Sequence, residues 1–267
     1  MPVYHDIYWG YEITHPDFWI HKSIGDSEFF TATLNCLDPF YEEPDAGLIA
    51  IRGEWNWAKK DIRPLWNETI GKTAGFLGAK NIGAAPWKLG DAVGLEAEIV
   101  LPKKDIRRLW TGILSHEFCV LHLMVSHPKT VRTTFEPLAT SVISSLKFSV
   151  PVFKFDITPE GIPIPPGYQR IDPKTVVDDI DDTAGWHAYD GETGIGALQS
   201  FYLREFPRHS WTISEYVPFT PLSNLGFARY RLAKDSIELT LGLMPAKSDD
   251  VESSQNHTRI VYKVSTT

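Results

Sequence analysis

The sequence lacks any segment that predicts a membrane span or a secretory signal. No stretch approaches the roughly 18 apolar residues of a spanning helix, and the opening MPVYHDIYWGYEITHP has neither a basic region nor an apolar core. Cysteine is also scarce, since Cys36 and Cys119 are the only two. Two cysteines in an untargeted chain favour buried thiols in a reducing compartment. We therefore expect a cytoplasmic protein with no membrane span.

Clustered basic residues are missing as well. The chain contains no run of four or more Lys or Arg, and its net charge is −8. A protein that binds the phosphate backbone needs clustered cations to displace counterions, so we expect no nucleic-acid partner. A hydrophobic content of 43% with 22% charged residues is typical of a globular protein. A length of 267 residues fits one large or two ordinary domains.

Catalytic signatures are missing too. The glycine, serine and acidic stretches match no P-loop, dinucleotide-binding, G-x-S-x-G or EF-hand pattern. The stretch HEFCVLHLMVSH, residues 116–127, begins like the zinc-protease motif H-E-x-x-H, but Val120 stands where the second histidine is required. The apolar residues around Cys119 and His122 favour a buried strand instead. We expect no metal and no cofactor.

A proline-rich segment divides the chain. Residues 158–173, TPEGIPIPPGYQRIDP, contain five prolines and two glycines. Proline fixes φ and removes a hydrogen-bond donor, so such a run cannot join a helix or a central strand. We predict a domain over residues 1–155, a linker over 156–173 and a smaller domain over 174–267.

The apolar spacing of the first domain predicts mostly strands with two helices. A hairpin bends near Gly10, one helix is capped by Asp61 and runs to about residue 77, and a second is capped by Thr134, with Leu138 in its apolar stripe. The predicted strands cover residues 28–36, 47–54, 92–101, 107–114 and 117–126.

The second domain shows the same mixture of strands with a helix. We predict a helix over residues 192–206, a loop over 246–256 and an edge strand over 259–264. The other predicted strands cover residues 186–189, 211–217, 226–232 and 236–244. Both domains are therefore expected to be α+β, each with an antiparallel sheet.

Residues 1–150 resemble the PsbP-like α/β/α sandwich superfamily. The resemblance lies in GYEITHPDFWI, in KLGDAVGLEAEIVL and in a closing segment that ends SSLKF. His15 departs from the pattern, which has an aromatic residue there. The positions that carry the match are Gly10, Tyr11, Ile13, Pro16, Trp19, Gly90, Ser145 and Phe148. The resemblance implies an antiparallel sheet flanked by helices, and members that mostly act as non-catalytic binding or assembly proteins.

Residues 185–216 resemble a small α+β module of bacterial proteins whose role is unknown. The text GWHAYDGETGIGALQSFYLREFPRHSWTISEY carries this likeness. Ser210 replaces the glycine that usually precedes the tryptophan at position 211. The resemblance implies a fold and no activity.

The segment RGEWNWAKK is the main candidate for a partner-binding surface. On a strand, Trp55 and Trp57 would share one face, beside Arg52, Lys59 and Lys60. Exposed Trp next to Arg and Lys is a common interface anchor. The sequence thus favours a non-catalytic protein that binds a protein partner or serves as an accessory subunit.

The alternative function is a small-molecule-binding protein or an enzyme, with a site at the domain junction. His122, Cys119, Glu96 and Glu98 are its likeliest participants. Glu96 and Glu98 would project from one face of a strand, where they could perform acid–base chemistry or simply face solvent. Convergence of two or more of these side chains in a pocket would favour this alternative.

Overall fold

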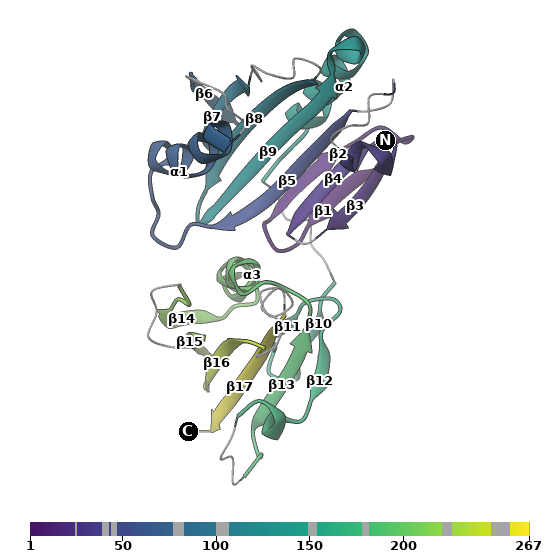
Figure 1. The fold of residues 1–267 in the computed structure, drawn as a ribbon. Helices are drawn as coiled ribbons and strands as arrows, with labels where there is room; N and C mark the ends of the chain where they lie inside the picture. The colour runs from purple at the N-terminus through teal and green to yellow at the C-terminus, as the bar shows by residue number, and fades with distance from the viewer. Residues whose placement is uncertain are drawn as a thin grey trace. The chain divides into compact units, whose positions relative to one another are not determined.

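A computed structural model describes most of the chain, as two compact units, Met1–Pro151 and Val152–Thr267 (Figure 1). The division lies close to the boundary predicted near residue 155. The described residues are 1–24, 26–38, 43, 47–76, 83–99, 107–148, 154–177, 182–220, 226–246 and 257–266, with only the backbone described for 72–76, 107 and 266.

The first unit is built on a seven-stranded antiparallel sheet with the order β3-β4-β5-β9-β8-β7-β6. Its strands are β3 (Ile20–Ile24), β4 (Ser27–Thr31), β5 (Leu48–Trp55), β6 (Ala85–Leu89), β7 (Ala92–Ile99), β8 (Arg107–His116) and β9 (Cys119–Pro128). A separate hairpin precedes them, β1 (Val3–Asp6) with β2 (Tyr11–Thr14). The helical elements are η1 (Leu34–Leu37), α1 (Ile62–Phe76), η2 (Lys129–Val131) and α2 (Arg132–Ser144).

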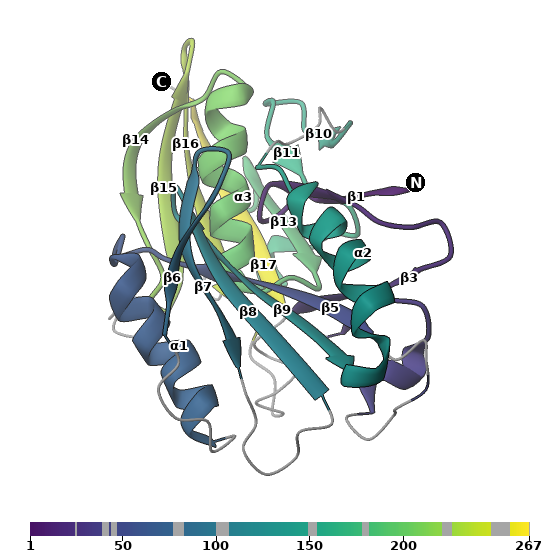
Figure 2. The ribbon, with the colours of Figure 1, turned by 90° about the horizontal axis from the view of Figure 1, so that it is seen from above.

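The two helices cover opposite faces of this sheet. Leu65 and Trp66 of α1 pack with Ile113 and Val120 on one side, which we call the α1 face. The other side, the α2 face, carries the strand positions that alternate with these, and α2 packs there through Phe135 and Val142 against Leu121 and Leu123. Figure 2 shows α1 lying along the part of the sheet that contains β6 and β7. Helix, sheet and helix make the three layers of an α/β/α sandwich, as predicted.

The β1–β2 hairpin completes the α2 face. Tyr11 and Ile13 are buried in the same cluster as Phe30 and α2. Glu12 exchanges two backbone hydrogen bonds with Lys147, at 2.8 and 3.0 Å, which ties the hairpin to the segment after α2. Gly10 has φ of 71°, a value that glycine adopts without strain, and it lies at the bend that the sequence predicts.

The second unit is a six-stranded antiparallel sheet with the order β12-β13-β17-β16-β15-β14. Its helix α3 (Ile195–Arg208) covers one face, with Leu198, Phe201 and Phe206 fully buried. The strands are β12 (Gln169–Ile171), β13 (Trp186–Gly191), β14 (Thr212–Val217), β15 (Ala228–Lys234), β16 (Ile237–Pro245) and β17 (Thr258–Thr266). A small hairpin, β10 (Asp156–Ile157) with β11 (Pro163–Ile164), and η3 (Pro173–Thr175) precede β13.

The segment predicted to be a linker, residues 156–173, instead forms part of the second unit. It supplies the β10–β11 hairpin and β12, whose residues 169–171 pair with β13. Trp211 Nε1 donates to the Gly161 carbonyl at 3.0 Å, which holds the hairpin against the sheet. Its prolines lie where a missing donor costs little, in a two-stranded hairpin and in turns next to an edge strand.

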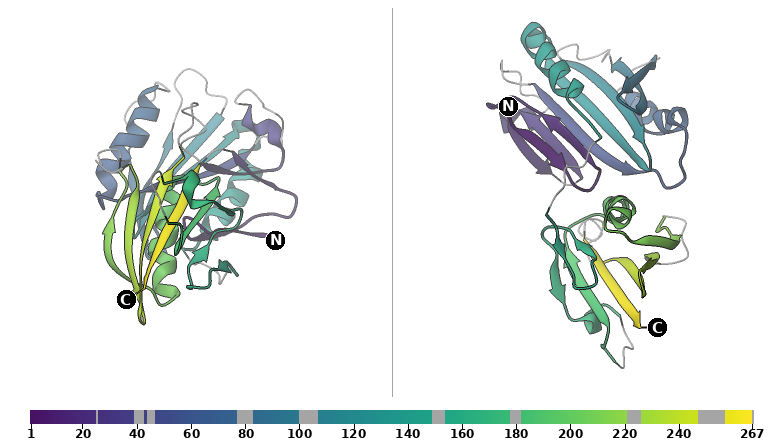
Figure 3. Two further views of the ribbon diagram at one scale, coloured as in Figure 1. Left: turned by 90° about the horizontal axis from the view of Figure 1, so that it is seen from below. Right: turned by 180° about the vertical axis from the view of Figure 1, so that it is seen from behind.

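Three further predictions need correction. The last strand, β17, yellow in Figure 3, is central and not an edge, because it pairs with both β13 and β16. Thr134 does not cap α2, since its hydroxyl donates to the Val131 carbonyl at 3.0 Å. Leu138 is exposed, and Ala139 and Ile143 take its place in the buried stripe. Of the predicted loop 246–256, residues 247–256 lie outside the described residues.

Candidate functional site

The candidate surface of the first unit is centred on the turn that follows β5. Asn56 is buried, and its side chain bonds Lys60 at both backbone groups: Oδ1 accepts from the Lys60 N–H at 2.9 Å, and Nδ2 donates to the Lys60 carbonyl at 3.0 Å. The Asn56 N–H donates to the Phe118 carbonyl at 2.8 Å, which joins this turn to the β8–β9 turn. Lys59 adopts a left-handed φ of 46°. The backbone of the turn is therefore held firmly.

Aromatic rings and a lysine lie together beside this turn. The rings of Trp55 and Phe118 lie 5.4 Å apart, and Lys59 Nζ lies 4.4 Å from the Phe118 ring centre. Trp57 follows at the tip of the turn with 40% of its surface exposed. An exposed Trp on a firmly held backbone offers a large apolar area without a loss of main-chain freedom on binding.

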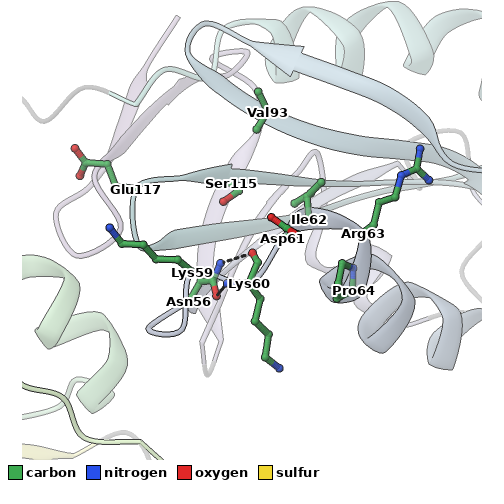
Figure 4. Close-up of a pocket in the computed structure, with 10 residues that line it drawn as sticks. All are labelled: Asn56, Lys59, Lys60, Asp61, Ile62, Arg63, Pro64, Val93, Ser115 and Glu117. Carbon is green, nitrogen blue, oxygen red and sulfur yellow. Dashed lines mark hydrogen bonds between the residues drawn. The ribbon is translucent and has the colours of Figure 1, made fainter.

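A pocket of about 490 Å³ adjoins the turn on the α1 face (Figure 4). It lies between the turn, the first residues of α1 and the ends of β7 and β8. Its lining is Asn56, Lys59, Lys60, Asp61, Ile62, Arg63, Pro64, Val93, Ser115 and Glu117. Val93 and Ser115 are register partners in the β7–β8 ladder, so the pocket reaches the sheet itself. We call Trp57 together with this pocket the Trp57 surface.

The charges around the pocket are mixed. Lys60 Nζ pairs with Glu68 Oε2 of α1 at 3.2 Å. Figure 4 shows Lys59 extending toward Glu117, while Lys60 and Arg63 extend in other directions, away from the middle of the pocket. The lining thus combines cations (Lys59, Lys60, Arg63) and carboxylates (Asp61, Glu117) with the apolar residues Ile62, Pro64 and Val93. Charged and apolar side chains occur together in this way at protein–protein interfaces.

The structure separates the five residues predicted for this surface. Lys59 and Lys60 line the pocket and Trp57 lies beside them, but Trp55 belongs to the α2 face through its register with Cys119. The expectation that Trp55 and Trp57 share a strand face is wrong, because β5 ends at Trp55 and the chain turns there. Arg52 lies on the α1 face outside the pocket, 4.0 Å from both Asp26 and Glu54.

The four residues of the alternative site do not converge. Cys119 lies on the α2 face and His122 on the α1 face of the same strand. Glu96 and Glu98 share one strand face as predicted, but each has a local partner. Trp110 Nε1 donates to Glu96 Oε2 at 3.0 Å, and Arg108 Nη1 lies 3.0 Å from Glu98 Oε1. The strand predicted over 117–126 is β9 (Cys119–Pro128), but it begins two residues later than predicted, because Glu117 and Phe118 form a turn.

His122 has a partner that the sequence did not indicate. Its Nε2 lies 2.8 Å from Glu54 Oε2, although the two residues are 68 positions apart. The hydrogen bond from His122 is the main cause that holds the pKa of Glu54 below its ordinary value. His122 Nδ1 is buried and makes no hydrogen bond within the part of the chain that the structure describes. The acceptor at Glu54 therefore fixes the ring proton on Nε2.

A second histidine–carboxylate pair lies under the β1–β2 hairpin. His21 Nε2 lies 2.6 Å from Glu28 Oε2, which also accepts from the Ser23 hydroxyl at 2.6 Å. Burial alone would raise the pKa of Glu28, but the hydrogen bonds from His21 and Ser23 outweigh it and lower the pKa. The Tyr4 ring packs against the His21 ring, with the two ring centres 4.1 Å apart. This arrangement fixes the inner side chains of β3.

Metal ligands do not gather in the described ranges. No group of three or more His, Cys, Asp or Glu side chains among them is placed to hold an ion. Within the same residues, no helix has the length and apolarity that crossing a bilayer requires.

Comparison with known proteins finds likeness at the level of solved structures. No family model matches the sequence. No curated protein matches it either. PsbP from the cyanobacterium Synechocystis is similar over 55% of this chain and 91% of its own, with 15% identity and a TM-score of 0.43. The Ran-binding protein Mog1p of Saccharomyces cerevisiae matches 56% of this chain and 95% of its own, with 9% identity and a TM-score of 0.39.

One solved structure spans both units. A protein from Bacteroides thetaiotaomicron covers 94% of this chain and 89% of its own, with 10% identity and a TM-score of 0.39. The predicted α/β/α sandwich is confirmed for the first unit, where α1 and α2 enclose the seven-stranded sheet.

Proposed function

We propose that this chain is a non-catalytic protein that binds a protein partner, or serves as an accessory subunit, through the Trp57 surface. The observation that carries the proposal is Trp57 itself, 40% exposed at the tip of a turn whose backbone Asn56 holds in place. Tryptophan is strongly enriched among the residues that dominate binding energy. An exposed Trp needs little reorganisation to bind when its main chain is already fixed.

The adjoining pocket supports the same role. A volume of about 490 Å³ is enough to take one or two side chains of a partner. The apolar wall supplied by Val93 and Ile62 suits an aliphatic or aromatic side chain. The surrounding Lys59, Arg63 and Glu117 would form the hydrated rim that sets the partner's orientation.

The proposal is tested by purifying the tagged protein gently from its own host and weighing the complexes by native mass spectrometry. We expect an added protein mass with the wild type and its loss with Trp57→Ala, because loss of a central Trp anchor weakens binding by about 30-fold or more. Trp57→Phe should keep part of the complex. Leu138→Ala, which removes an exposed apolar side chain from α2, is the control and should leave the complex intact.

Two outcomes would contradict this assignment. If Trp57→Ala retains the full complex, the partner binds elsewhere on the chain. If the wild type carries a small-molecule mass and no protein mass, the result favours the alternative function, a ligand-binding protein or an enzyme.

A cytoplasmic location is part of the proposal. Its support is that Cys36 and Cys119 are both buried and lie in separate apolar clusters instead of forming a disulfide with each other. Paired cysteines would be more typical of an oxidising compartment. Fractionation of the host with a compartment marker for each fraction tests this point.

A further inference from the structure

The outer edge of β3 differs from the other edges of the two large sheets. Those sheets have four edge strands, β3 and β6 in the first unit and β12 and β14 in the second. An edge strand presents unpaired N–H and C=O groups that can accept another strand, and proteins usually block them. Three of the four edges carry such a block.

Each of these three edges is protected in a recognisable way. In β6, Pro86 removes a donor from the strand. In β14 a register shift between Ile213 and Glu215 distorts the ladder. The strand β12 has only three residues. Proline, a bulge and shortness are all known means of preventing edge-to-edge pairing.

The edge of β3 lacks all three of these features. It runs for five residues in regular register with β4, and β4 is its only strand partner among the described residues. Ile20, Lys22 and Ile24 share the α1 face, because their register partners are Thr31, Phe29 and Ser27. Ile20 is 42% exposed and Ile24 45%. Lys22 is exposed and has no ion pair with any residue that the structure describes.

The side chains of β3 that face away from Lys22 are held in place on the α2 face. His21 and Ser23 both bond to Glu28 on the α2 face, at 2.6 Å each. On the α1 face, the strand presents an apolar, a charged and an apolar side chain in turn. A strand prepared in this way can be extended by one more strand with little rearrangement.

We propose that β3 binds an extended segment of a partner protein, by strand addition, in which an acidic residue lies between two apolar residues at alternate positions. The acidic side chain would lie opposite Lys22, and the two apolar side chains opposite Ile20 and Ile24. Directly opposed side chains on neighbouring strands are close enough for opposite charges and apolar pairs to stabilise the pairing. This surface is separate from the Trp57 surface.

Lys22 also argues against self-pairing. In a symmetric antiparallel dimer through β3 that is centred on this residue, Lys22 would face Lys22 of the second copy, and like charges directly opposed destabilise the pair. The same side chain therefore disfavours a second copy of this chain and favours an acidic strand. We therefore infer that the segment bound at this edge comes from a different protein.

The test uses the full chain with two synthetic seven-residue peptides, Thr-Val-Thr-Asp-Thr-Val-Thr and the same peptide with Lys in place of Asp. Fluorescence anisotropy gives the affinity, and hydrogen exchange of residues 20–24 gives the location. We expect the acidic peptide to slow exchange in β3 and to bind about fivefold more tightly than the basic one. Lys22→Glu should reverse this order of affinity.

Lys88→Glu is the matched control, since it reverses an exposed charge on the protected edge β6 and should leave the order unchanged. Equal binding of the two peptides, protection at residues 85–89 instead of 20–24, or no binding at millimolar peptide would each overturn the proposal. A reversal with Lys22→Glu that is accompanied by protection of residues 20–24 establishes it.

Discussion

Glu54 Oε2 and His122 Nε2 lie 2.8 Å apart across the β5–β9 ladder, on the α1 face of the first sheet. The hydrogen bond from His122 is the largest cause of the lowered pKa of Glu54, and Arg52 adds to it. A carboxyl whose pKa is lower in the folded state stabilises the fold above its ordinary pKa. That contribution is lost as the pH falls through the folded pKa.

We therefore predict that Glu54→Gln lowers the free energy of unfolding at pH 7 by at most about 1 kcal/mol. The effect is small because the Glu54 side chain is 42% exposed and solvent screens the pair. The difference between variant and wild type should shrink as the pH falls below the ordinary Glu value of 4.5 and toward the lower, folded value. Urea unfolding at a series of pH values measures it.

Asp91→Asn is the control for that series, because Asp91 is exposed in the β6–β7 turn and the described residues show no ion pair for it. Its difference from the wild type should not follow the same pH dependence. A Glu54→Gln effect that grows toward acid would mean that the carboxylate does not stabilise the fold.

Gly53, the one glycine within β5, is predicted to tolerate no larger side chain. A Cβ added there would lie 2.1 Å from the Trp9 ring, so the ring packs directly on the glycine backbone. We expect Gly53→Ala to displace Trp9 and to destabilise the first unit by about 1–3 kcal/mol, as overpacking does. Denaturant unfolding followed by tryptophan fluorescence measures both effects.

Gly71→Ala is the matched comparison and should have the opposite sign. Gly71 lies inside α1, where an added Cβ meets nothing within 4 Å. Alanine is the better helix former, so we expect a gain of up to about 1 kcal/mol. Equal destabilisation by both variants would show that the Trp9 contact is not the cause.

The helices of this fold were predictable from the sequence because their signals are local. In α1, the turn at Asp61, the spacing of Leu65, Trp66 and Ile70 and the end near residue 77 all lie within the helix or next to it. The position of β17 depends instead on pairing with β13 and β16, which no local pattern reports. One local signal was present, since Ile260, Val261 and Tyr262 are consecutive and all buried, as in a strand covered on both faces.

The candidate site was predictable only in part for the same reason. Lys59 and Lys60 were found because exposed cations next to Trp57 are visible in the sequence. Trp55 was misplaced because alternation holds only as long as the strand continues, and β5 ends at that residue. The Glu54–His122 pair joins residues that meet only when β5 and β9 pair, so spacing along the chain could not reveal it.

The two cysteines are predicted to be unreactive in the folded protein. Cys36 packs with Leu48, while Cys119 packs in the cluster under α2, and both are almost fully buried. Reaction with an exposed-thiol reagent should be slow in buffer and immediate in denaturant, with two thiols titrated. Rapid reaction of one thiol in buffer would show that its cluster opens readily.

Gln199 is predicted to be the polar residue on which α3 and the following strands depend most. It is fully buried, its Oε1 accepts from the Tyr216 hydroxyl at 2.8 Å and from the Phe219 N–H at 2.9 Å, and its Nε2 contacts the Phe219 carbonyl at 3.4 Å. Gln199→Leu keeps the volume but leaves these groups without their partner. We expect the second unit to lose about 3 kcal/mol of stability, since each unpaired buried polar group costs about 1–3 kcal/mol.

Hydrogen exchange measured by mass spectrometry can assign this loss to the second unit. Peptides from α3, β14 and β15 should exchange faster in Gln199→Leu, while peptides from β5 and β9 in the first unit should not change. Gln169→Leu, at an exposed position of the edge strand β12, is the control and should exchange like the wild type. If both variants behave alike, water replaces the lost hydrogen bonds around Tyr216 and Phe219, and the side chain of Gln199 is not what fixes α3 on the sheet.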